Sequence, residues 1–351
     1  NAIRNSVAEP WNCELIWGCT RSLLDPGFQS SCLPRLEDGG TAVTSATISL
    51  PFSTVNAFYT KNGLPVEQDA NYYKDGMYFP VKYSKDNSEF TEHYDFDYNY
   101  RYVIENETTA GMNFDREPRF YASVGFDRGV WYGNSYSDPA GDQSESQAAY
   151  RYPRNRFGEF SSVWNSTWYN VTGYWAKKLV ALRSTFTGSD NVSFYSVPFP
   201  DMRYADLLLM AAEAWNEAEE TPNEKVYDYL DQVRERAGLE GIKETYAKYA
   251  SVQYKDYPSH KSQMRDIIHR ERQVELSCEG SYYWDTRRWK TAEKELNRIV
   301  QGWNVLNGET AEDYYIPTNI YNQQFTLRDY FAPIPDGDII RNPQLVQNPW
   351  W

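Results

Sequence analysis

Residues 267–289 read IIHRERQVELSCEGSYYWDTRRW. The pattern predicts one helix, a sharp break at Gly280 and a second helix that starts on an aromatic-rich turn. Glu271, Glu275 and Glu279 recur every four residues, so they share one face of the first helix. Because stacked like charges repel by roughly a few tenths of a kcal/mol per pair, we expect nearby cations to neutralise them.

Arginines of the same stretch are the first candidates for this neutralisation. They are Arg270, Arg272, Arg287 and Arg288. The alternative is an enzyme in which two of the glutamates form a general acid/base pair. Nothing in their spacing distinguishes a catalytic pair from a structural ion network, and we favour the network.

A helix pair is predicted before this stretch, from Asp201 onward. Its apolar residues keep the i, i+3, i+4, i+7 spacing of a helix that buries one face. They are Tyr204, Leu207, Leu208, Ala211, Ala214, Trp215 and Ala218. Residues 221–224 (TPNE) predict the start of the next helix, with Thr221 as its N-cap, and Gly238 predicts its end. Two antiparallel helices with alanines at their contact are typical of a tetratricopeptide-type pair.

The quoted stretch supplies a second pair, predicted at residues 262–278 and 282–300. The last of these helices is expected to bury Trp289, Ala292, Leu296 and Ile299. Because such pairs stack into a superhelix, the predicted fold class is mainly α. Long irregular aromatic-rich loops and a few short strands complete it, and the Pro- and Asn-rich tail from Tyr330 is expected to wrap over the scaffold in extended form.

Residues 1–200 lack a sustained helical period, although residues 14–19 predict a short strand and residues 53–59 a short helix. We therefore divide the chain into a loop-rich region, residues 1–200, that carries the ligand site, and a helical-repeat scaffold with its tail, residues 201–351. The two are expected to form one structural unit.

An acidic segment in the first region starts like a calcium loop, with Asp95, Asp97 and Asn99 in a D-x-D-x-N order. Tyr100 stands where an EF-hand needs glycine, and Asn106 stands where it needs glutamate, so an EF-hand is excluded. A solvated acidic loop is favoured over an irregular structural calcium site. We expect no other metal and no cofactor.

Aromatic residues are abundant, with 30 Tyr, 16 Phe and 12 Trp. Several lie among Asn, Ser and Gly in segments without clear periodicity, where loops would expose them. Tyr and Trp offer a flat apolar face and a polar edge, which suits the C–H faces and hydroxyls of a sugar. The predicted ligand-binding residues are Trp131, Tyr132, Trp164, Trp168 and Tyr169. The alternative is that these aromatics anchor long loops to the core.

The composition of the chain disfavours several classes of function and binding partner. Lys and Arg number 35 against 49 Asp and Glu, a net charge of −14, which disfavours nucleic acid and anionic membrane surfaces as partners. No run approaches the ~20 apolar residues of a transmembrane helix. A Gly-rich phosphate loop and a Ser-His-Asp order are also absent from the sequence, so we expect a binding protein and not an enzyme.

Three of the four cysteines, Cys13, Cys19 and Cys32, lie in the first 32 residues. A disulfide among them is possible if the protein is exported. Cys278 is the fourth. A metal site is less favoured, because the histidines are scattered along the chain.

The quoted stretch resembles the signature of the SusD/RagB family, surface lipoproteins that capture nutrients for outer-membrane transporters. Four other stretches agree with it in family order. They are residues 59–63 (YTKNG), 115–121 (DREPRFY), 203–213 (RYADLLLMAAE) and 331–351 (FAPIPDGDIIRNPQLVQNPWW). One departure is residues 278–282 (CEGSY), where the family more often has an aromatic before Glu-Gly and a basic residue after it.

The resemblance implies a SusD-like fold and a function without chemistry. Such a protein holds an oligosaccharide or polysaccharide at the bacterial cell surface and passes it to a SusC-like TonB-dependent transporter. It would be an outer-membrane lipoprotein, with its lipid anchor and first helical repeats on an N-terminal segment outside this sequence. A peptide ligand is the main alternative, and a glycoside hydrolase, which needs two carboxylates about 5–10 Å apart, is a remote one.

Overall fold

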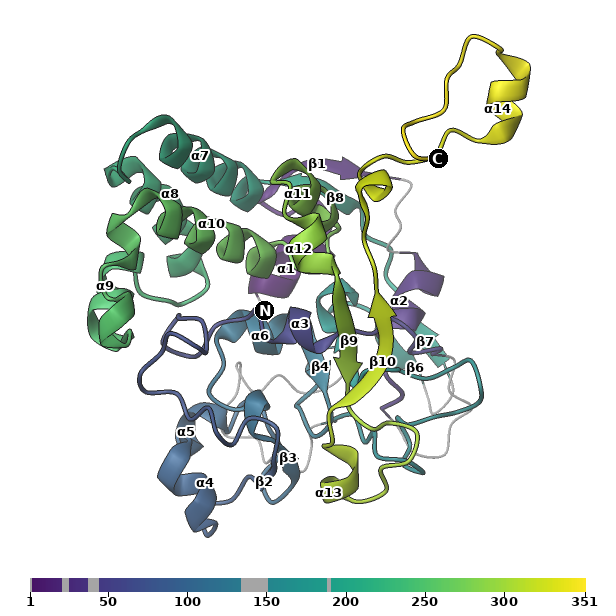
Figure 1. Ribbon diagram of the computed structural model, residues 1–351. Coiled ribbons are helices and arrows are strands. Elements are labelled where there is room, and N and C mark those ends of the chain that lie inside the picture. Colours follow the sequence, from purple (N-terminus) through teal and green to yellow (C-terminus); the bar gives the residue numbers. More distant parts are fainter. Residues whose placement is uncertain (1, 21–24, 37–43, 134–150, 188–190) are drawn as a thin grey trace.

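A computed structural model describes residues 2–20, 25–36, 44–133, 151–187 and 191–351. Its longest helices gather in one part of the molecule, and short helices, strands and loops make up the rest (Figure 1). In chain order the α-helices are α1 (Ala2–Ala8), α2 (Pro26–Cys32), α3 (Phe52–Val55), α4 (Ser88–His93), α5 (Phe96–Asn99), α6 (Pro118–Ser123), α7 (Tyr204–Ala218), α8 (Glu224–Arg236), α9 (Ile242–Tyr249), α10 (Lys261–Glu275), α11 (Ser281–Arg288), α12 (Ala292–Leu296), α13 (Ala311–Tyr314) and α14 (Asp336–Arg341).

The strands are short and pair in twos, all antiparallel: β1 (Leu15–Cys19) with β8 (Phe199–Arg203), β2 (Pro80–Lys82) with β3 (Thr108–Ala110), β4 (Val124–Phe126) with β5 (Tyr174–Ala176), β6 (Thr185–Thr187) with β7 (Asn191–Ser193), and β9 (Arg298–Gly302) with β10 (Thr318–Gln323). No larger sheet is formed by the described residues. With about 39% of the described residues helical, the structure agrees with the predicted mainly-α class.

The helical part has its own apolar core between α7, α8, α9 and α10. Helix α8 starts later than predicted, because Asn223 and not Thr221 is the N-cap: its side chain accepts hydrogen bonds from the backbone N–H groups of Lys225 and Val226. The helix ends at Arg236 with Ala237 as its C-cap, two residues before the predicted end. Gly238 follows the cap with a left-handed φ of +80° that glycine adopts without strain, so the glycine signal is close to the true end. The predicted tetratricopeptide superhelix stays a prediction.

The prediction of a single helix over residues 282–300 is wrong. Helix α11 ends at Arg288, Lys290 has a φ of +58°, and only the short α12 follows before the chain enters β9. Asn297 fixes the turn, because its side chain exchanges two hydrogen bonds with the backbone of Phe325 beside β10. Ile299 is 52% exposed on the strand and is not buried.

The core of the loop-rich region extends beyond residue 200. Trp303, Val305, Tyr314 and Tyr315 pack in it with aromatics such as Phe120. These residues come from the segment after α12, so the chain returns to the first region once the helices are complete. The two predicted regions therefore interlock.

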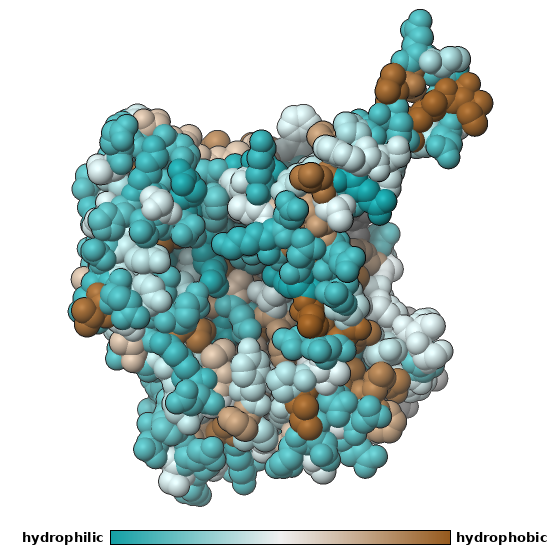
Figure 2. Space-filling view, viewed as in Figure 1, coloured by the Kyte–Doolittle hydropathy of each residue, from teal (hydrophilic) through white to brown (hydrophobic). Residues whose placement is uncertain are grey.

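The tail differs from its prediction. It does not wrap over the scaffold but projects from the molecule as an arm with its own helix, α14 (Figure 1). Gln347 closes the arm by two hydrogen bonds to the backbone of Ile334, and the indole N–H of Trp351 donates to the carbonyls of Arg328 and Phe331. Because these groups bond within the tail, the arm does not need the scaffold to satisfy them. Apolar side chains lie exposed on it (Figure 2).

Buried cations form a network of ion pairs that neutralises the three glutamates of the quoted stretch. The Arg119 guanidinium lies between Glu117 at 2.7 Å, Glu271 at 2.5 Å and Glu275 at 3.3 Å, and all four side chains are almost fully buried. Arg234 adds a second contact to Glu271 at 3.3 Å. The expected charge neutralisation is confirmed, and the carboxylates are too buried to contact a substrate as an acid/base pair.

The same network continues toward the break at Gly280. Arg203 contacts Glu275 at 3.1 Å and Glu279 at 2.7 Å, Lys178 contacts Glu279 at 2.6 Å, and Arg236 contacts Glu275 at 2.5 Å. Segments far apart in the sequence therefore meet at one face of α10.

The arginines predicted to neutralise the three glutamates pair elsewhere. Arg270 bonds Glu67, Arg272 bonds Asp206 and Asp285, Arg288 bonds Glu213, and Arg287 donates to backbone carbonyls. Arg270 and Arg272 are next to Glu271 in the chain, and successive helical residues point to different faces. The neutralising cations come instead from other segments.

Two of the cysteines considered for a disulfide are free thiols. Cys32 is buried and Cys13 is exposed, so neither takes part in the suggested disulfide.

The acidic segment that starts like a calcium loop uses its first aspartate for structure. Asp95 caps α5 by accepting a hydrogen bond from the Tyr98 N–H, and it forms an ion pair with Lys61 at 3.0 Å. In the part of the chain that the structure describes, no helix combines the length and apolar character needed to cross a membrane, and no cluster of three or more His, Cys, Asp or Glu side chains could hold a metal ion.

Replacing Arg119 by Met should lower the free energy of unfolding by about 3–5 kcal/mol, because three carboxylates would stay buried without their shared cation. Urea denaturation measures the loss. The matched control is Arg265→Met, which removes an exposed pair with Glu217 and should cost ~1 kcal/mol or less. Equal losses in the two variants would contradict a structural role for the network.

Stability should also depend on pH through Glu279. Burial would raise the pKa of this carboxyl, but Arg203 and Lys178 outweigh burial and hold it below the ordinary value of 4.5. Its ionised form therefore stabilises the fold above about pH 4.5, and this stabilisation is lost as the pH falls. Glu279→Gln should be less stable than the parent protein at pH 7, and denaturation at lower pH should show the difference shrinking. A difference that stays constant from pH 7 to pH 3 would disprove this.

Candidate functional site

The predicted ligand-binding aromatics fall into two groups. Trp131 is 0% exposed and Tyr132 is 9% exposed, so the expectation that they lie on an open loop is wrong. Trp131 packs against Gly125 of β4, where any side chain would collide with the indole. The ammonium group of Lys177 is buried beside them, 5.4 Å from the Trp131 ring and 4.4 Å from the Tyr132 ring. Neither ring offers a free face to a ligand.

The second group forms an exposed turn, residues 163–169, which we call the tryptophan loop. Trp164 is 51% exposed and Trp168 is 42% exposed, while Tyr169 is half-buried against the core. The side-chain oxygen of Asn165 accepts three hydrogen bonds of 2.9 Å, from the N–H and hydroxyl of Thr167 and the N–H of Trp168. These bonds hold the two tryptophans on one short turn.

The side chain of Arg35 packs against the tryptophan loop. Its guanidinium lies 5.4 Å from the centre of the Trp164 ring, and its Nε donates to the Phe160 carbonyl at 3.1 Å. Burial lowers the pKa of this guanidinium to about 10, so it keeps its charge at neutral pH. The loop therefore presents two partly open indoles, one of them held over a fixed cation.

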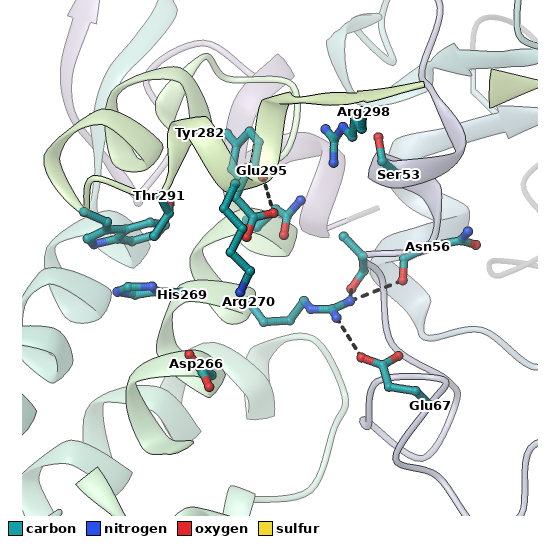
Figure 3. Close-up of a pocket in the computed structure, with 14 residues that line it drawn as sticks. Ser53, Asn56, Glu67, Asp266, His269, Arg270, Tyr282, Thr291, Glu295 and Arg298 are labelled. Atoms are coloured by element: carbon teal, nitrogen blue, oxygen red, sulfur yellow. Dashed lines mark hydrogen bonds and ion pairs between the residues drawn. The ribbon is translucent and has the colours of Figure 1, made fainter. Parts of the chain in front are cut away.

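A pocket of about 440 Å³ lies on the other side of α10 from the ion network. Residues of three segments line it: the end of α3 with the loop that follows, the outward face of α10, and the chain from α11 to the start of β9 (Figure 3). We call it the α10–α12 pocket. Its volume falls in the range of small-molecule sites, and its lining is mainly polar.

Arg270 connects two sides of this pocket. Its guanidinium donates to the backbone carbonyls of Asn56 at 3.3 Å and Ala57 at 3.1 Å, and it pairs with Glu67 at 2.9 Å (Figure 3). The helix and the loop are therefore joined by one side chain. Because all three contacts are made by one rigid group, the pocket wall is held in place before a ligand arrives.

An aromatic pair forms another wall. The His269 ring stacks on Trp289 with centroids 3.5 Å apart and planes 13° apart, and the indole N–H of Trp289 donates to Glu213 at 2.9 Å. Burial lowers the pKa of His269 to about 4, so the imidazole is neutral at pH 7. Near it, burial raises the pKa of Asp266, while Lys294 and Arg265 oppose that rise.

The remaining polar groups of the pocket differ in how they are satisfied. Tyr282 donates its hydroxyl proton to Glu295 at 3.3 Å. The Nε of Arg298 is buried and has no hydrogen-bond partner among the described residues. The Asn56 amide points away from the pocket, and its NH2 group donates to the Tyr78 hydroxyl at 3.3 Å (Figure 3).

Comparison with known proteins gives the family. The model of the SusD family matches residues 26–351. Two relatives from Formosa agariphila are similar over part of the chain. SusD-like protein P2 is 31% identical over 153 residues, which are 44% of this chain and 26% of the relative. SusD-like protein P38 is 32% identical over 147 residues, which are 42% of this chain and 23% of the relative.

Solved structures agree over almost the whole chain. The structure of BT4246 has a TM-score of 0.76 at 25% identity and covers 99% of this chain and 53% of its own. The structure of a SusD-like protein (BF3747) from Bacteroides fragilis has a TM-score of 0.67 at 18% identity. The match covers 97% of this chain and 55% of that protein. The chain thus spans about half the length of these solved relatives. Since the family match covers all but the first 25 of its 351 residues, the chain belongs to the SusD family.

Proposed function

We propose that this SusD-family chain binds an oligosaccharide or polysaccharide at the bacterial cell surface without cleaving it. The bound glycan then passes to a SusC-like TonB-dependent transporter in the outer membrane. Family membership supports this class of function. A lipid anchor would hold the protein at the membrane.

The tryptophan loop is the observation that carries the proposal. Trp164 and Trp168 expose indole faces that suit the C–H faces of sugar rings. Asn165 and Thr167 hold the turn by their mutual hydrogen bonds, so the two rings are ordered before the ligand binds. Ordered aromatics lose little conformational entropy on binding, so more of the stacking energy appears as affinity.

A delivery role fits a site that holds its ligand reversibly. Two stacking contacts of about 1–2 kcal/mol each, by analogy with base stacking, give a weak single-site affinity. A long glycan would bind well only by engaging several sites at once, and it would leave one site at a time. Such binding suits transfer to a transporter better than tight storage does.

The double variant Trp164→Ala/Trp168→Ala should lose glycan binding, with roughly a tenfold weaker affinity for each ring removed. Affinity electrophoresis against plant, host and fungal polysaccharides measures retardation, and the glycans are checked afterwards for cleavage. The matched control is Trp284→Ala on α11, a tryptophan outside the loop that is 69% exposed.

Each outcome is informative. Retardation lost in the double variant and kept in the control supports the proposal. Retardation kept in the double variant would remove the tryptophan loop as the site. A parent protein that binds peptides but no glycan would favour the peptide alternative, and cleaved glycan would overturn the non-catalytic assignment.

A further inference from the structure

We propose that the α10–α12 pocket binds a sugar unit with a single carboxylate, so that the glycan recognised by this protein contains uronic acid. This inference rests on the proposed function and names the ligand chemistry of a second site, separate from the tryptophan loop. The observations that carry it are two cations of the pocket that have no carboxylate partner among the described residues, the neutral polar residues beside them and the placement of the pocket's own carboxylates.

Most arginines near the pocket already have carboxylate partners. Arg270 pairs with Glu67, Arg265 with Glu217 and Arg288 with Glu213. Arg298 and Lys294 line the pocket and differ from them: no carboxylate oxygen among the described residues lies within 4 Å of either cation. They are therefore the positive charges that remain for a ligand.

Arg298 is the stronger anchor of the two. Its Nε is buried and has no hydrogen-bond partner in the described structure, although a buried guanidinium N–H is costly to leave unsatisfied. Figure 3 shows Arg298 beside Ser53 at the edge of the pocket. A carboxylate matches the planar fork of a guanidinium with two parallel hydrogen bonds, so it satisfies this donor better than a neutral hydroxyl does.

Neutral polar residues of the pocket can bond the hydroxyls of the same sugar. Ser53, Gln273 and Thr291 line the cavity together with Arg298 and Lys294. Hydroxyl and amide groups both donate to and accept from sugar hydroxyls. One ring with a carboxylate and hydroxyls therefore uses the cations and the neutral polar groups, whereas a simple anion uses only the cations.

The carboxylates of the pocket limit the ligand's charge. Asp266 and Glu295 line the same cavity, and Glu295 accepts a hydrogen bond from the hydroxyl of Tyr282 at 3.3 Å. They would repel a ligand with several negative charges on neighbouring positions. The site therefore suits one charge per sugar unit, as in a uronic acid, better than a densely sulfated chain.

The test compares acidic polymers with their own neutral forms. Polygalacturonate, alginate and hyaluronan are each used as such and after chemical reduction of the carboxyl groups, with dextran sulfate as a polyanion control. Affinity electrophoresis of the whole 351-residue chain should show at least one acidic polymer bound roughly tenfold more tightly than its reduced form. Dextran sulfate should bind less tightly than that polymer.

Variants then place the effect in the pocket. Arg298→Gln and Lys294→Gln should each remove most of the preference for the acidic form, and Arg298→Lys should restore part of it. The control Lys248→Gln removes an exposed cation outside the pocket, paired with Glu240, and should change nothing. Thermal melts confirm that each variant folds before its binding is compared.

Failure of this inference is distinct from failure of the proposed function. Equal binding of every acidic polymer and its reduced form, or a preference unaffected by Arg298→Gln, would overturn the uronic acid assignment. In either case glycan binding lost with the Trp164→Ala/Trp168→Ala variant would leave the proposed function standing. Tighter binding of dextran sulfate than of any uronate polymer would overturn the inference as well, since the site would then be a general anion surface.

Discussion

The burial of several carboxylates behind α10 is the constraint on which the rest of the structure depends. Removing an ion from water costs several kcal/mol, so each carboxylate needs a cation at a fixed position. Arg119 contributes from α6, Arg203 from β8 and Arg234 from α8, and all of them converge on Glu271 and Glu275. Three elements from two parts of the chain are thereby locked to one helix, and their relative positions cannot change without exposing a charge pair.

This lock also shapes the candidate pocket, because one helix serves both features. The side of α10 that carries Glu271 and Glu275 faces the ion network, while Asp266, His269 and Arg270 point into the pocket. The ion pairs fix one side of α10, so the side that faces the pocket is held in place as well. A substitution in the network would therefore shift the pocket wall, although no residue of the network lines the pocket.

The sequence predicts those features of the molecule that depend on residues near one another in the chain. The helices at residues 204–218 and 261–275, and the turn at Gly280, follow from periodicity and glycine chemistry, and the structure contains them. Partners from distant segments could not be read in this way. Trp131 looks like a loop residue until β4 and β5 cover it, and the pocket exists only because the α3 loop lies against α10. An aromatic that lies between two glycines, here Gly129 and Gly133, is ambiguous without that tertiary context.

The core of the loop-rich region contains residues that come before and after the helical part in the sequence. The backbone leaves the loop-rich region at β8 and returns to it at Trp303, so the helices form an insertion held at both ends. Anchoring the ends of a segment of roughly a hundred residues reduces the number of conformations open to it when it unfolds. The helices are therefore stabilised partly through their unfolded state, and local opening of α7 to α12 remains confined between two fixed points while the first core is intact.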